Sequence, residues 1–309
     1  MIKIEGITAF VAVAEAGSVS EAARRLRLSK SVVSERLAEL EKTLGAKLLH
    51  RTTRKLTLTE DGVAFLERAT RIVHEVQEAA SDIAERRGTL AGPVRIAAPV
   101  TFGRLHLGPA LYAFLGEHPD IELIMDLDDR RVDAAADGYD AVIRHGTIQD
   151  TRLIAWKLAP SRRLLVASPD YLLRNGTPAS LAELDSHRGI LYTNRGNFDW
   201  RFERPEGPVI VRARSALRMN NGDMIADAAI AGLGIALLPA FIAGPPVKAG
   251  KLVEIDVGYR AQPEFIYMAH SEGRHPSVKL KAMAQHLKRA FGNPPYWDAA
   301  AQVDVDEDV

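Results

Sequence analysis

A run of hydrogen-bonding side chains near the N-terminus has the residue types that read DNA bases. Ser29, Lys30, Ser31, Ser34 and Glu35 stand close together in the chain. Lysine can donate to guanine N7 and O6, serine to either groove edge, and glutamate can accept from cytosine N4. We therefore expect this run to contact base edges in a major groove. Glu35 is the weakest candidate, because a carboxylate near phosphates can turn aside to Lys30 instead.

Two short helices must position these side chains. Ser18 and Glu21 have capping-box spacing, in which each side chain satisfies a free amide, so a helix should begin near Val19 and end by Leu28. Ser29 can cap a second helix. One buried stripe follows the second helix at spacings of four, three and four residues: Val33, Leu37, Leu40 and Leu44. Two helices across a tight turn form the helix-turn-helix arrangement that fits a major groove.

The segment around these helices carries a local excess of positive charge. From Arg24 to Leu58 there are ten Lys or Arg and three Glu, although the 309-residue chain has a formal net charge of zero. From Lys47 to Thr59 basic or polar residues alternate with apolar ones, as in a small hairpin with a cationic tip. This hairpin would form a wing whose cations hold the phosphate backbone. The candidates are Arg51, Arg54 and Lys55.

Several of these segments together resemble a LysR-type transcriptional regulator. They are Phe10 to Ser18, Ala22 to Leu26, Ser29 to Ser34, Leu40-Glu41 with Leu44-Gly45, Leu48 to Arg54 and Leu58 to Gly62. The resemblance covers about the first sixty residues without a gap. It implies an N-terminal, all-α winged helix-turn-helix and, after it, an α/β two-lobed effector domain resembling type II periplasmic binding proteins.

Two further helices are expected in the N-terminal part. The apolar residues from Ile4 to Ala16 recur at helical spacing, and Gly17 can end that helix. A secretory leader is the rival interpretation of residues 7–14, but the run is short and lies between Glu5 and Glu15. No stretch approaches the length of a transmembrane span. We therefore expect a cytoplasmic protein with no membrane partner.

The second of these helices should open at Glu60 and run to about Arg87. Its apolar positions form a narrow seam: Val63, Leu66, Ala69, Val73, Val76, Ala80 and Ile83. The seam predicts a homodimer whose wings address the two half-sites of a pseudo-palindromic operator in double-stranded DNA. A helix lying on its own domain is the other interpretation. The family resemblance implies the dimer, often doubled to a homotetramer. RNA polymerase is a further candidate partner for a transcriptional regulator.

Composition shifts divide the chain. We predict a DNA-binding domain over 1–59, a linker helix over 60–88 and an effector domain over 93–297, because two glycines and a proline interrupt residues 88–93. Lobe I should comprise about 93–163 and 266–292, and lobe II about 164–265. An acidic tail, expected to be disordered, follows over 298–309.

Alternating strands and helices predict parallel α/β architecture in the effector domain. The expected strands cover 94–98, 121–127, 141–144, 153–158, 163–167, 235–238 and 265–269, with a strand-rich stretch over 189–219. The expected helices cover 105–116, 132–136, 169–175, 181–184, 223–231 and 277–291. From the resemblance, the two crossings between the lobes should lie near 163–167 and 266–269.

Helix starts on both lobes are candidates for binding an effector. Pro99 to Gly103 and Asn220 to Gly222 each lead into a helix, whose free amides can bind an anion. The candidate contacts are Thr101, Phe102, Arg144, Thr193, Asn194 and Asn221. A small aromatic or aliphatic carboxylic acid would suit them. Alternatively, Thr101 and Asn221 only cap helices, and Arg144 only pairs with Asp140 or Asp128.

Motifs for catalysis are absent from the sequence. There is no Gly-x-Ser-x-Gly elbow, no His-Glu-x-x-His and no phosphate loop, and the chain has no Cys. We therefore expect neither an enzyme nor a cofactor or metal site. Two other functions stay open beside the regulator: a solute-binding protein, and an architectural DNA-binding protein without an effector.

Overall fold

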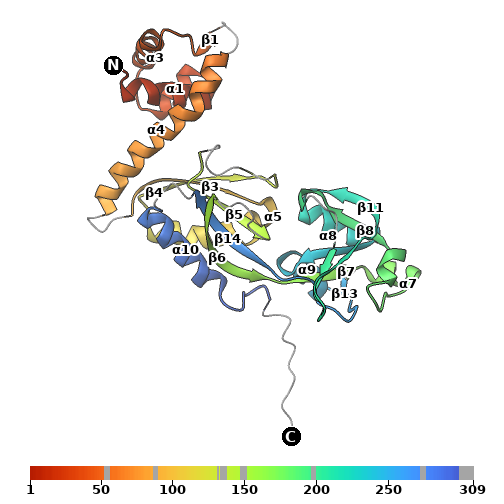
Figure 1. The fold of residues 1–309 in the computed structure, drawn as a ribbon. Coiled ribbons are helices and arrows are strands. Elements are labelled where there is room, and N and C mark those ends of the chain that lie inside the picture. Colours follow the sequence, from red (N-terminus) through yellow and green to blue (C-terminus); the bar gives the residue numbers. More distant parts are fainter. Residues whose placement is uncertain are drawn as a thin grey trace. The chain divides into compact units, whose positions relative to one another are not determined.

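The computed structural model describes residues 1–51, 56–85, 90–130, 132, 138–146, 152–195, 200–271 and 276–298. These residues form two compact units, with the division after Pro93 (Figure 1). The first is helical with a small hairpin, and the second contains two five-stranded sheets.

The first unit confirms the elements expected around the helix-turn-helix. They are α1 (Ile4–Ala16), α2 (Val19–Arg25), α3 (Lys30–Leu44), β1 (Leu49–Arg51), β2 (Leu56–Leu58) and α4 (Glu60–Glu85). Gly17 and Gly45 end α1 and α3 in the left-handed conformation, with φ of 62° and 68°. Ser18 and Ser29 accept hydrogen bonds from the amides of Glu21 and Val32, so each hydroxyl caps the helix that follows.

Small residues let the helices of this unit pack closely around large apolar ones. Phe10, Leu37 and Leu48 are fully buried in its core, and Ala9 and Ala22 lie with them. Close approach also explains Gly62, because a Cβ atom at that position would overlap the backbone carbonyl of Leu48. The absent side chain therefore allows α4 to begin against the segment that leads into β1.

Helix α4 has two parts with different surroundings. Leu66, Ala69 and Val73 pack on the core of the first unit, beside Phe65. Val63 and Val76 remain 61% and 50% exposed. The interpretation that α4 lies on its own domain therefore holds for the stretch from Phe65 to Val73. Beyond Val73, the described seam position is Val76, and it is exposed.

The second unit opens with a five-stranded sheet in the order β4-β3-β5-β14-β6. The strands are β3 (Gly92–Ala98), β4 (Ile121–Leu127), β5 (Ala141–Gly146), β6 (Leu153–Ser161) and β14 (Glu264–Ser271). β3 and β5 are parallel, whereas β14 runs antiparallel to both β5 and β6. Helices α6 (Gly108–Glu117) and α10 (Val278–Phe291) pack against each other, and α10 also contacts β6.

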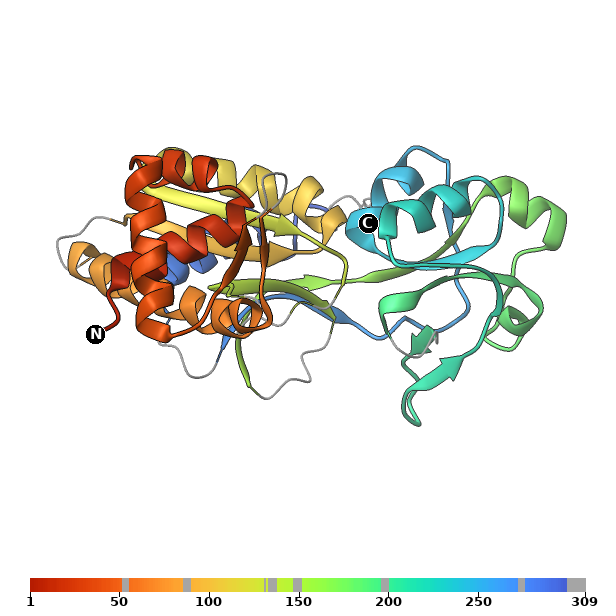
Figure 2. The same ribbon diagram turned by 90° about the horizontal axis from the view of Figure 1, so that it is seen from above.

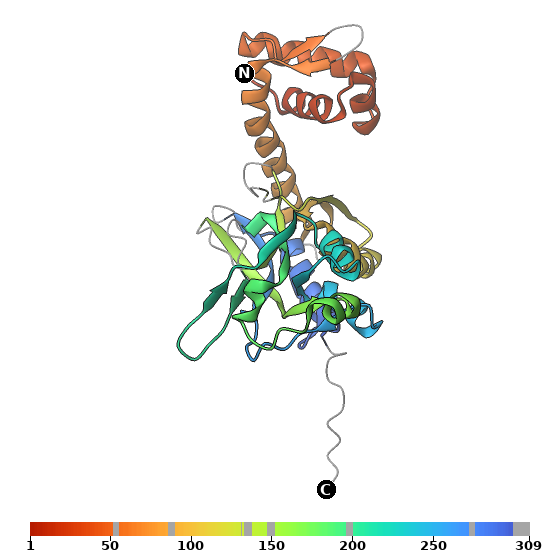
Figure 3. The same cartoon turned by 90° about the vertical axis from the view of Figure 1, so that its right-hand side faces the viewer.

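The other sheet has the order β11-β8-β12-β7-β13. Its strands are β7 (Arg163–Ala167), β8 (Arg188–Tyr192), β11 (Arg214–Met219), β12 (Ile235–Pro239) and β13 (Val253–Glu254). A ribbon of β9 (Trp200–Phe202) and β10 (Val209–Val211) projects beside it (Figure 3). Helices α7 (Pro169–Asn175), α8 (Gly222–Ile230) and α9 (Ala240–Lys248) complete this lobe. Both sheets are mixed, because β7 and β14 run against their neighbours, so the expected parallel architecture is wrong in this respect.

The chain passes between the two sheets twice (Figure 2). The crossings predicted near 163–167 and 266–269 are misplaced, because β7 belongs wholly to the second sheet and β14 wholly to the first. The passages lie between Ser161 and Arg163 and just before Glu264, and Ser161 pairs with Glu264. Pro160 and Pro263 lie beside the two passages, so the sequence does carry a proline signal at each of them.

Other differences are local. The helix predicted over 105–116 starts earlier, with α5 (Val100–Phe102) and a π-helical turn at Gly103–Leu107, and a 3₁₀ turn at Glu183–Ser186 replaces the helix over 181–184. α9 and β13 were not predicted. Two prolines, Pro245 and Pro246, lie inside α9 and conceal its helical pattern. Except for Val132, the helix predicted over 132–136 lies outside the described residues, as does the tail from 299 onward.

Candidate functional site

The start of α3 presents the polar side chains that the sequence singled out. Lys30, Ser31 and Glu35 are exposed and Ser34 is half-buried, all within the first two turns. The Ser29 hydroxyl lies 2.8 Å from that of Ser31 and accepts from the amide of Val32 at 3.3 Å. Ser29 is therefore a capping residue first. The other four side chains lie on the helix end that can enter a groove.

A strained residue sets the turn between α2 and α3. Arg27 has φ of 54°, the one positive φ outside glycine in the described chain. Its amide donates to the carbonyl of Arg24, and the amide of Leu28 donates to that of Ala23. These bonds close α2 and redirect the chain into α3. No sequence signal pointed to Arg27, because an arginine at such a turn is uncommon.

Glu21 does not complete the expected capping box. Its carboxylate accepts hydrogen bonds from Arg24 at 2.6 and 3.0 Å and from Arg25 at 3.4 Å, instead of turning back to Ser18. The bond to Arg24 lowers the pKa of the Glu21 carboxyl. Arg24 and Arg25 thus share one carboxylate, which offsets one of their two positive charges, because both follow Glu21 on the same helix face.

The wing is the antiparallel β1–β2 hairpin, in which Leu49 pairs with Leu58 and Arg51 with Leu56. The side chain of Arg51 and the whole of residues 52–55 lie outside the described residues. Arg54 and Lys55, predicted at the tip, are therefore not located by the structure.

A buried carboxylate joins the wing to α3. Glu41 is 5% exposed and accepts hydrogen bonds from Lys47 Nζ at 2.6 Å and from the amides of Leu48 and Leu49 at 3.0 and 3.4 Å. Burial opposes the charge, but these bonds outweigh it and lower the pKa of the Glu41 carboxyl. From the sequence Glu41 was only one of three acids in a basic segment. Its place at the edge of the buried stripe was the signal available.

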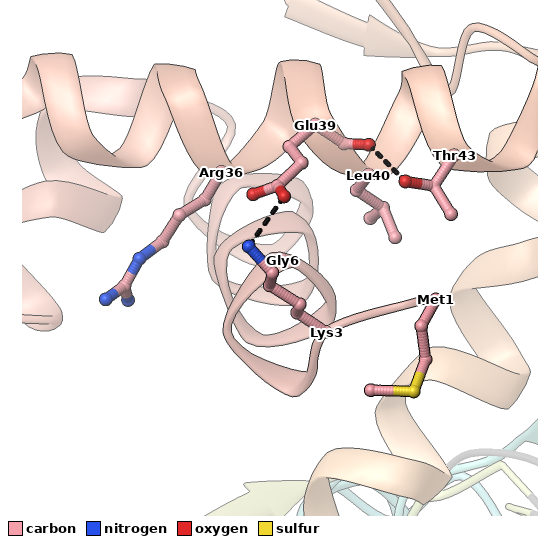
Figure 4. A pocket seen from close by; sticks show the side chains of 7 residues that line it. All are labelled: Met1, Lys3, Gly6, Arg36, Glu39, Leu40 and Thr43. Carbon is pink, nitrogen blue, oxygen red and sulfur yellow. Dashed lines mark hydrogen bonds and ion pairs between the residues drawn. The ribbon is translucent and has the colours of Figure 1, made fainter.

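A shallow hollow lies between the start of α1 and the side of α3 (Figure 4). Lys3 Nζ and Glu39 Oε1 pair across it at 2.7 Å, which raises the pKa of Lys3 and lowers that of Glu39. Arg36 points away from this pair. Met1, Lys3 and Glu39 are all well exposed, so the hollow is an open surface feature and not an enclosed ligand cavity.

In the second unit, Asp129 gathers groups from both lobes. Its Oδ1 accepts the amide of Val100 at 3.0 Å, and its Oδ2 accepts from Asn221 Nδ2 at 2.8 Å. Asn194 Nδ2 donates to the backbone carbonyl of Asp129. Val100 and Asp129 belong to the lobe of the first sheet, and both asparagines belong to the other. Asp129 was not among the effector candidates named from the sequence.

Thr101 lies beside this cluster. Its side chain is buried, at 4% residue exposure, and its hydroxyl has no hydrogen-bond partner in the part of the chain that the structure describes. A Cβ atom on Gly222 would lie 3.7 Å from that hydroxyl. Asn221 also caps α8, since its Oδ1 accepts the amide of Met224. Asn194 and Asn221 thus contact Asp129 directly, and Thr101 follows Val100, whose amide donates to Asp129.

The remaining effector candidates lie elsewhere. Phe102 is buried in an aromatic cluster, with ring centroids 5.2 Å from Phe241 and 5.5 Å from Phe291, so it is a packing residue. Arg144 Nη2 donates to the carbonyl of Val132. Asp128, one of its suggested partners, accepts hydrogen bonds from Arg130. Thr193 begins a 3₁₀ turn and is half-buried.

A second contact joins the lobes near Asp129. Arg104 Nη2, in the π-helical turn Gly103–Leu107, and Asp223 Oδ2, in α8, lie 3.2 Å apart. Both side chains are partly exposed, so the pair contributes little to stability by itself.

None of the helices in the described ranges is both long enough and apolar enough to cross a membrane.

Comparisons with known proteins cover both units. Residues 4–63 match the family model for bacterial regulatory helix-turn-helix proteins of the lysR family, and residues 87–292 match the LysR substrate binding domain. The chain is 34% identical over 298 residues to the transcriptional regulator PtxR of Pseudomonas aeruginosa, with 96% of this chain and 95% of that protein covered. It is 32% identical over 290 residues to DmlR of Escherichia coli, with 93% and 94% covered.

Solved structures agree. CrgA of Neisseria meningitidis, a LysR-type transcriptional regulator, matches with a TM-score of 0.58 at 27% identity, over 93% of this chain and 98% of that one. The Vibrio cholerae virulence activator AphB matches with a TM-score of 0.56 at 27% identity, over 92% and 98%.

Proposed function

Since the chain belongs to the LysR family of DNA-binding, effector-responsive transcriptional regulators, we propose how it performs that work. It reads an operator with the exposed start of α3 and holds the phosphate backbone with the β1–β2 wing. It responds to a small organic acid bound between the two lobes of its second unit. Its relatives are regulators, and we assign it no enzymatic activity.

The observation that carries the DNA assignment is the start of α3. Lys30, Ser31, Ser34 and Glu35 form a polar surface on a helix end that is capped by Ser29 and backed by a buried stripe. This exposed helix end offers hydrogen-bond donors and acceptors to base edges, as a recognition helix does. In the same proposal Arg51, Arg54 and Lys55 hold phosphates.

The assembly in this proposal is a homodimer on a pseudo-palindromic operator, with pairing of dimers into a tetramer. The exposed Val76 on α4, beyond the packed Val73, supports it. We divide the chain into a DNA-binding domain over 1–59, a linker helix over 60–88 and an effector domain over 93–297. A cytoplasmic location and a contact with RNA polymerase complete the proposal.

The effector assignment rests on Thr101, Asn194 and Asn221, which converge from the two lobes. Hydroxyl and amide donors near helix starts suit a carboxylate. Thr193 and Arg144 are retained as flanking candidates. Phe102 contributes only by packing.

The test is binding of the purified full chain to DNA upstream of its own gene, against scrambled DNA, across a salt series. We expect sequence-selective binding that weakens steeply with salt, because phosphate contacts release counterions. The same samples are then titrated with small aromatic and aliphatic carboxylates.

Two outcomes would contradict the proposal. Saturable acid binding without salt-dependent DNA affinity would indicate a solute-binding protein. Selective DNA binding that no carboxylate alters, with no saturable ligand, would indicate an architectural DNA-binding protein.

A further inference from the structure

Asp129 occupies the donors that a ligand carboxylate would use. One carboxylate oxygen takes the amide of Val100 and the other takes the side-chain amide of Asn221, which belongs to the opposite lobe. Asn194, also from the opposite lobe, donates to the main chain of the same residue. Three donors from two lobes thus converge on one residue.

Asp128, the neighbouring acid in the loop, has different hydrogen-bond partners from Asp129. Asp128 accepts from Arg130 Nε at 2.9 Å and from Nη2 at 2.7 Å, and this pairing lowers the pKa of the Asp128 carboxyl. Among the described residues, its side chain makes no hydrogen bond to the opposite lobe. Its partner is exposed, with the Arg130 side chain 82% accessible. Asp128 is therefore a solvated ion pair, whereas Asp129 faces the other lobe.

The surroundings of Asp129 are set up for an anion. The hydroxyl of Thr101, next to Val100 in the chain, is buried without a hydrogen-bond partner among the described residues. A buried, unsatisfied hydroxyl is costly and gains from any acceptor brought to it. Gly222 follows Asn221 directly and packs against Ile242, since a Cβ there would lie 2.5 Å from Ile242 Cδ1 and 3.7 Å from the Thr101 hydroxyl.

We propose that Asp129 is an internal stand-in for the effector: its carboxylate holds the lobes together in the ligand-free chain, and an effector carboxylate binds by displacing it. This rests on the proposed effector site and adds its regulation. The two anions compete because Val100 and Asn221 supply one set of donors, and because two carboxylates placed side by side repel each other.

Chemical rescue tests the proposal. In full-length Asp129→Ala the donors are empty, so acetate should fill them. We expect a lower thermal midpoint for this variant than for the wild type. Acetate, compared with chloride at equal ionic strength, should restore the midpoint with an apparent affinity about tenfold or more tighter than it has for the wild type. Adding Asn221→Ala to Asp129→Ala should abolish the rescue.

Two controls keep the outcome decisive. Asp128→Ala removes the adjacent carboxylate and should show neither the loss nor the rescue. Asp129→Asn keeps the shape of the side chain, so it serves if the alanine variant does not fold. The side-chain NH2 group of asparagine is itself a donor and cannot accept from Val100 or Asn221. Acetate affinity should therefore rise in this variant too. Equal stabilisation of wild type and both Asp129 variants by acetate would overturn the proposal.

Failure of this inference is distinguishable from failure of the proposed function. The same variants are titrated with operator DNA in the salt series. Selective, salt-dependent binding with no acetate rescue would leave the regulator intact and refute the role of Asp129 alone. Loss of selective binding by the wild type would refute the proposed function instead.

Discussion

At the residue scale, burial decides how much an acidic side chain contributes to the stability of the first unit. Glu41 is buried and satisfied by one ammonium group and two backbone amides. Glu39, two positions earlier, pairs with Lys3 on the surface. Replacing a buried carboxylate leaves its hydrogen-bond donors without an acceptor. Each member of a surface ion pair can bind water instead.

Glu41→Gln should therefore destabilise the first unit by about 2 kcal/mol, because the amide cannot satisfy all three donors. Urea unfolding followed by circular dichroism measures the change. Glu39→Gln is the matched control and should leave the midpoint nearly unchanged. A similar loss in both variants would contradict the assignment.

Glu41 also makes the stability of this unit depend on pH. The folded pKa lies below the ordinary value of 4.5, so the unfolded chain takes up the proton first as the pH falls. The contribution is complete well above pH 4.5 and is lost as the pH drops through the folded pKa. Unfolding midpoints of the wild type measured between pH 7 and about pH 3 should fall more steeply than those of Glu41→Gln.

Mutations of base contacts and mutations of phosphate contacts should differ in how their effect on binding depends on the operator sequence. Lys30→Ala should relax selectivity at particular operator positions, by about 1–3 kcal/mol per contacted base pair. Arg54→Ala, in the wing tip, should weaken binding to all sequences alike and lower the salt slope. Lys42→Ala, at the far end of α3, is the control. Binding to a library of single-base operator variants measures this, and equal effects of Lys30→Ala and Arg54→Ala on every sequence would refute the two roles.

At the element scale, close contacts without a side chain fix where α4 begins. Gly62 leaves room for the carbonyl of Leu48, and a methyl group there would overlap it. Gly62→Ala should destabilise the first unit by about 1–3 kcal/mol, since α4 must shift away from the wing. Gly116→Ala is the control, because a Cβ built there meets nothing within 4 Å apart from its chain neighbours and the backbone of its own helix. Thermal unfolding of both variants decides the matter, and a neutral Gly62→Ala would show that α4 can move freely.

The exposed part of α4 makes a second prediction at this scale. Val76 is 50% exposed on a face that is covered only as far as Val73. If this face is the dimer interface, Val76→Glu should place a charge in an apolar seam and weaken dimerisation tenfold or more, which corresponds to about 1.4 kcal/mol. Analytical ultracentrifugation measures it, with Glu75→Gln as the neighbouring control. An unchanged dissociation constant would locate the interface elsewhere.

At the scale of the whole regulatory unit, a buried histidine connects both lobes and the C-terminal segment. His106 Nδ1 lies 2.6 Å from the Tyr296 hydroxyl and Nε2 lies 3.4 Å from the carbonyl of Phe241. Burial lowers the pKa of His106, and the bond to Phe241 offsets this only in part. Burial likewise lowers the pKa of His270.

Both histidines are thus held neutral, and the unfolded chain takes up protons before the folded one. Stability of this unit should be complete above the ordinary histidine pKa of 6.5 and fall as the pH decreases below it. Thermal midpoints at pH 7.5 and 5.5 test the sign. His106→Gln should flatten the slope in part, because His270 keeps its share. A midpoint that rises on acidification would contradict the assignment.

The sequence by itself determined the local elements of this protein. The helices at 4–16 and 169–175, the starts at Val19 and Lys30, and the strands at 121–127 and 163–167 all agree with prediction. Caps, periodicity and glycine stops act between residues a few positions apart, so they are written in the sequence. The same is true of the family, whose pattern lies in consecutive segments.

Only the tertiary structure decided how distant segments meet. The antiparallel course of β14, the points of crossing between the lobes and helix α9 with its two prolines depend on pairing and packing across the fold. Of the effector candidates, Thr101, Asn194 and Asn221 were named from local cap and loop signals. Their convergence on Asp129 depends on contacts between residues 29 to 92 positions apart, which no local pattern encodes.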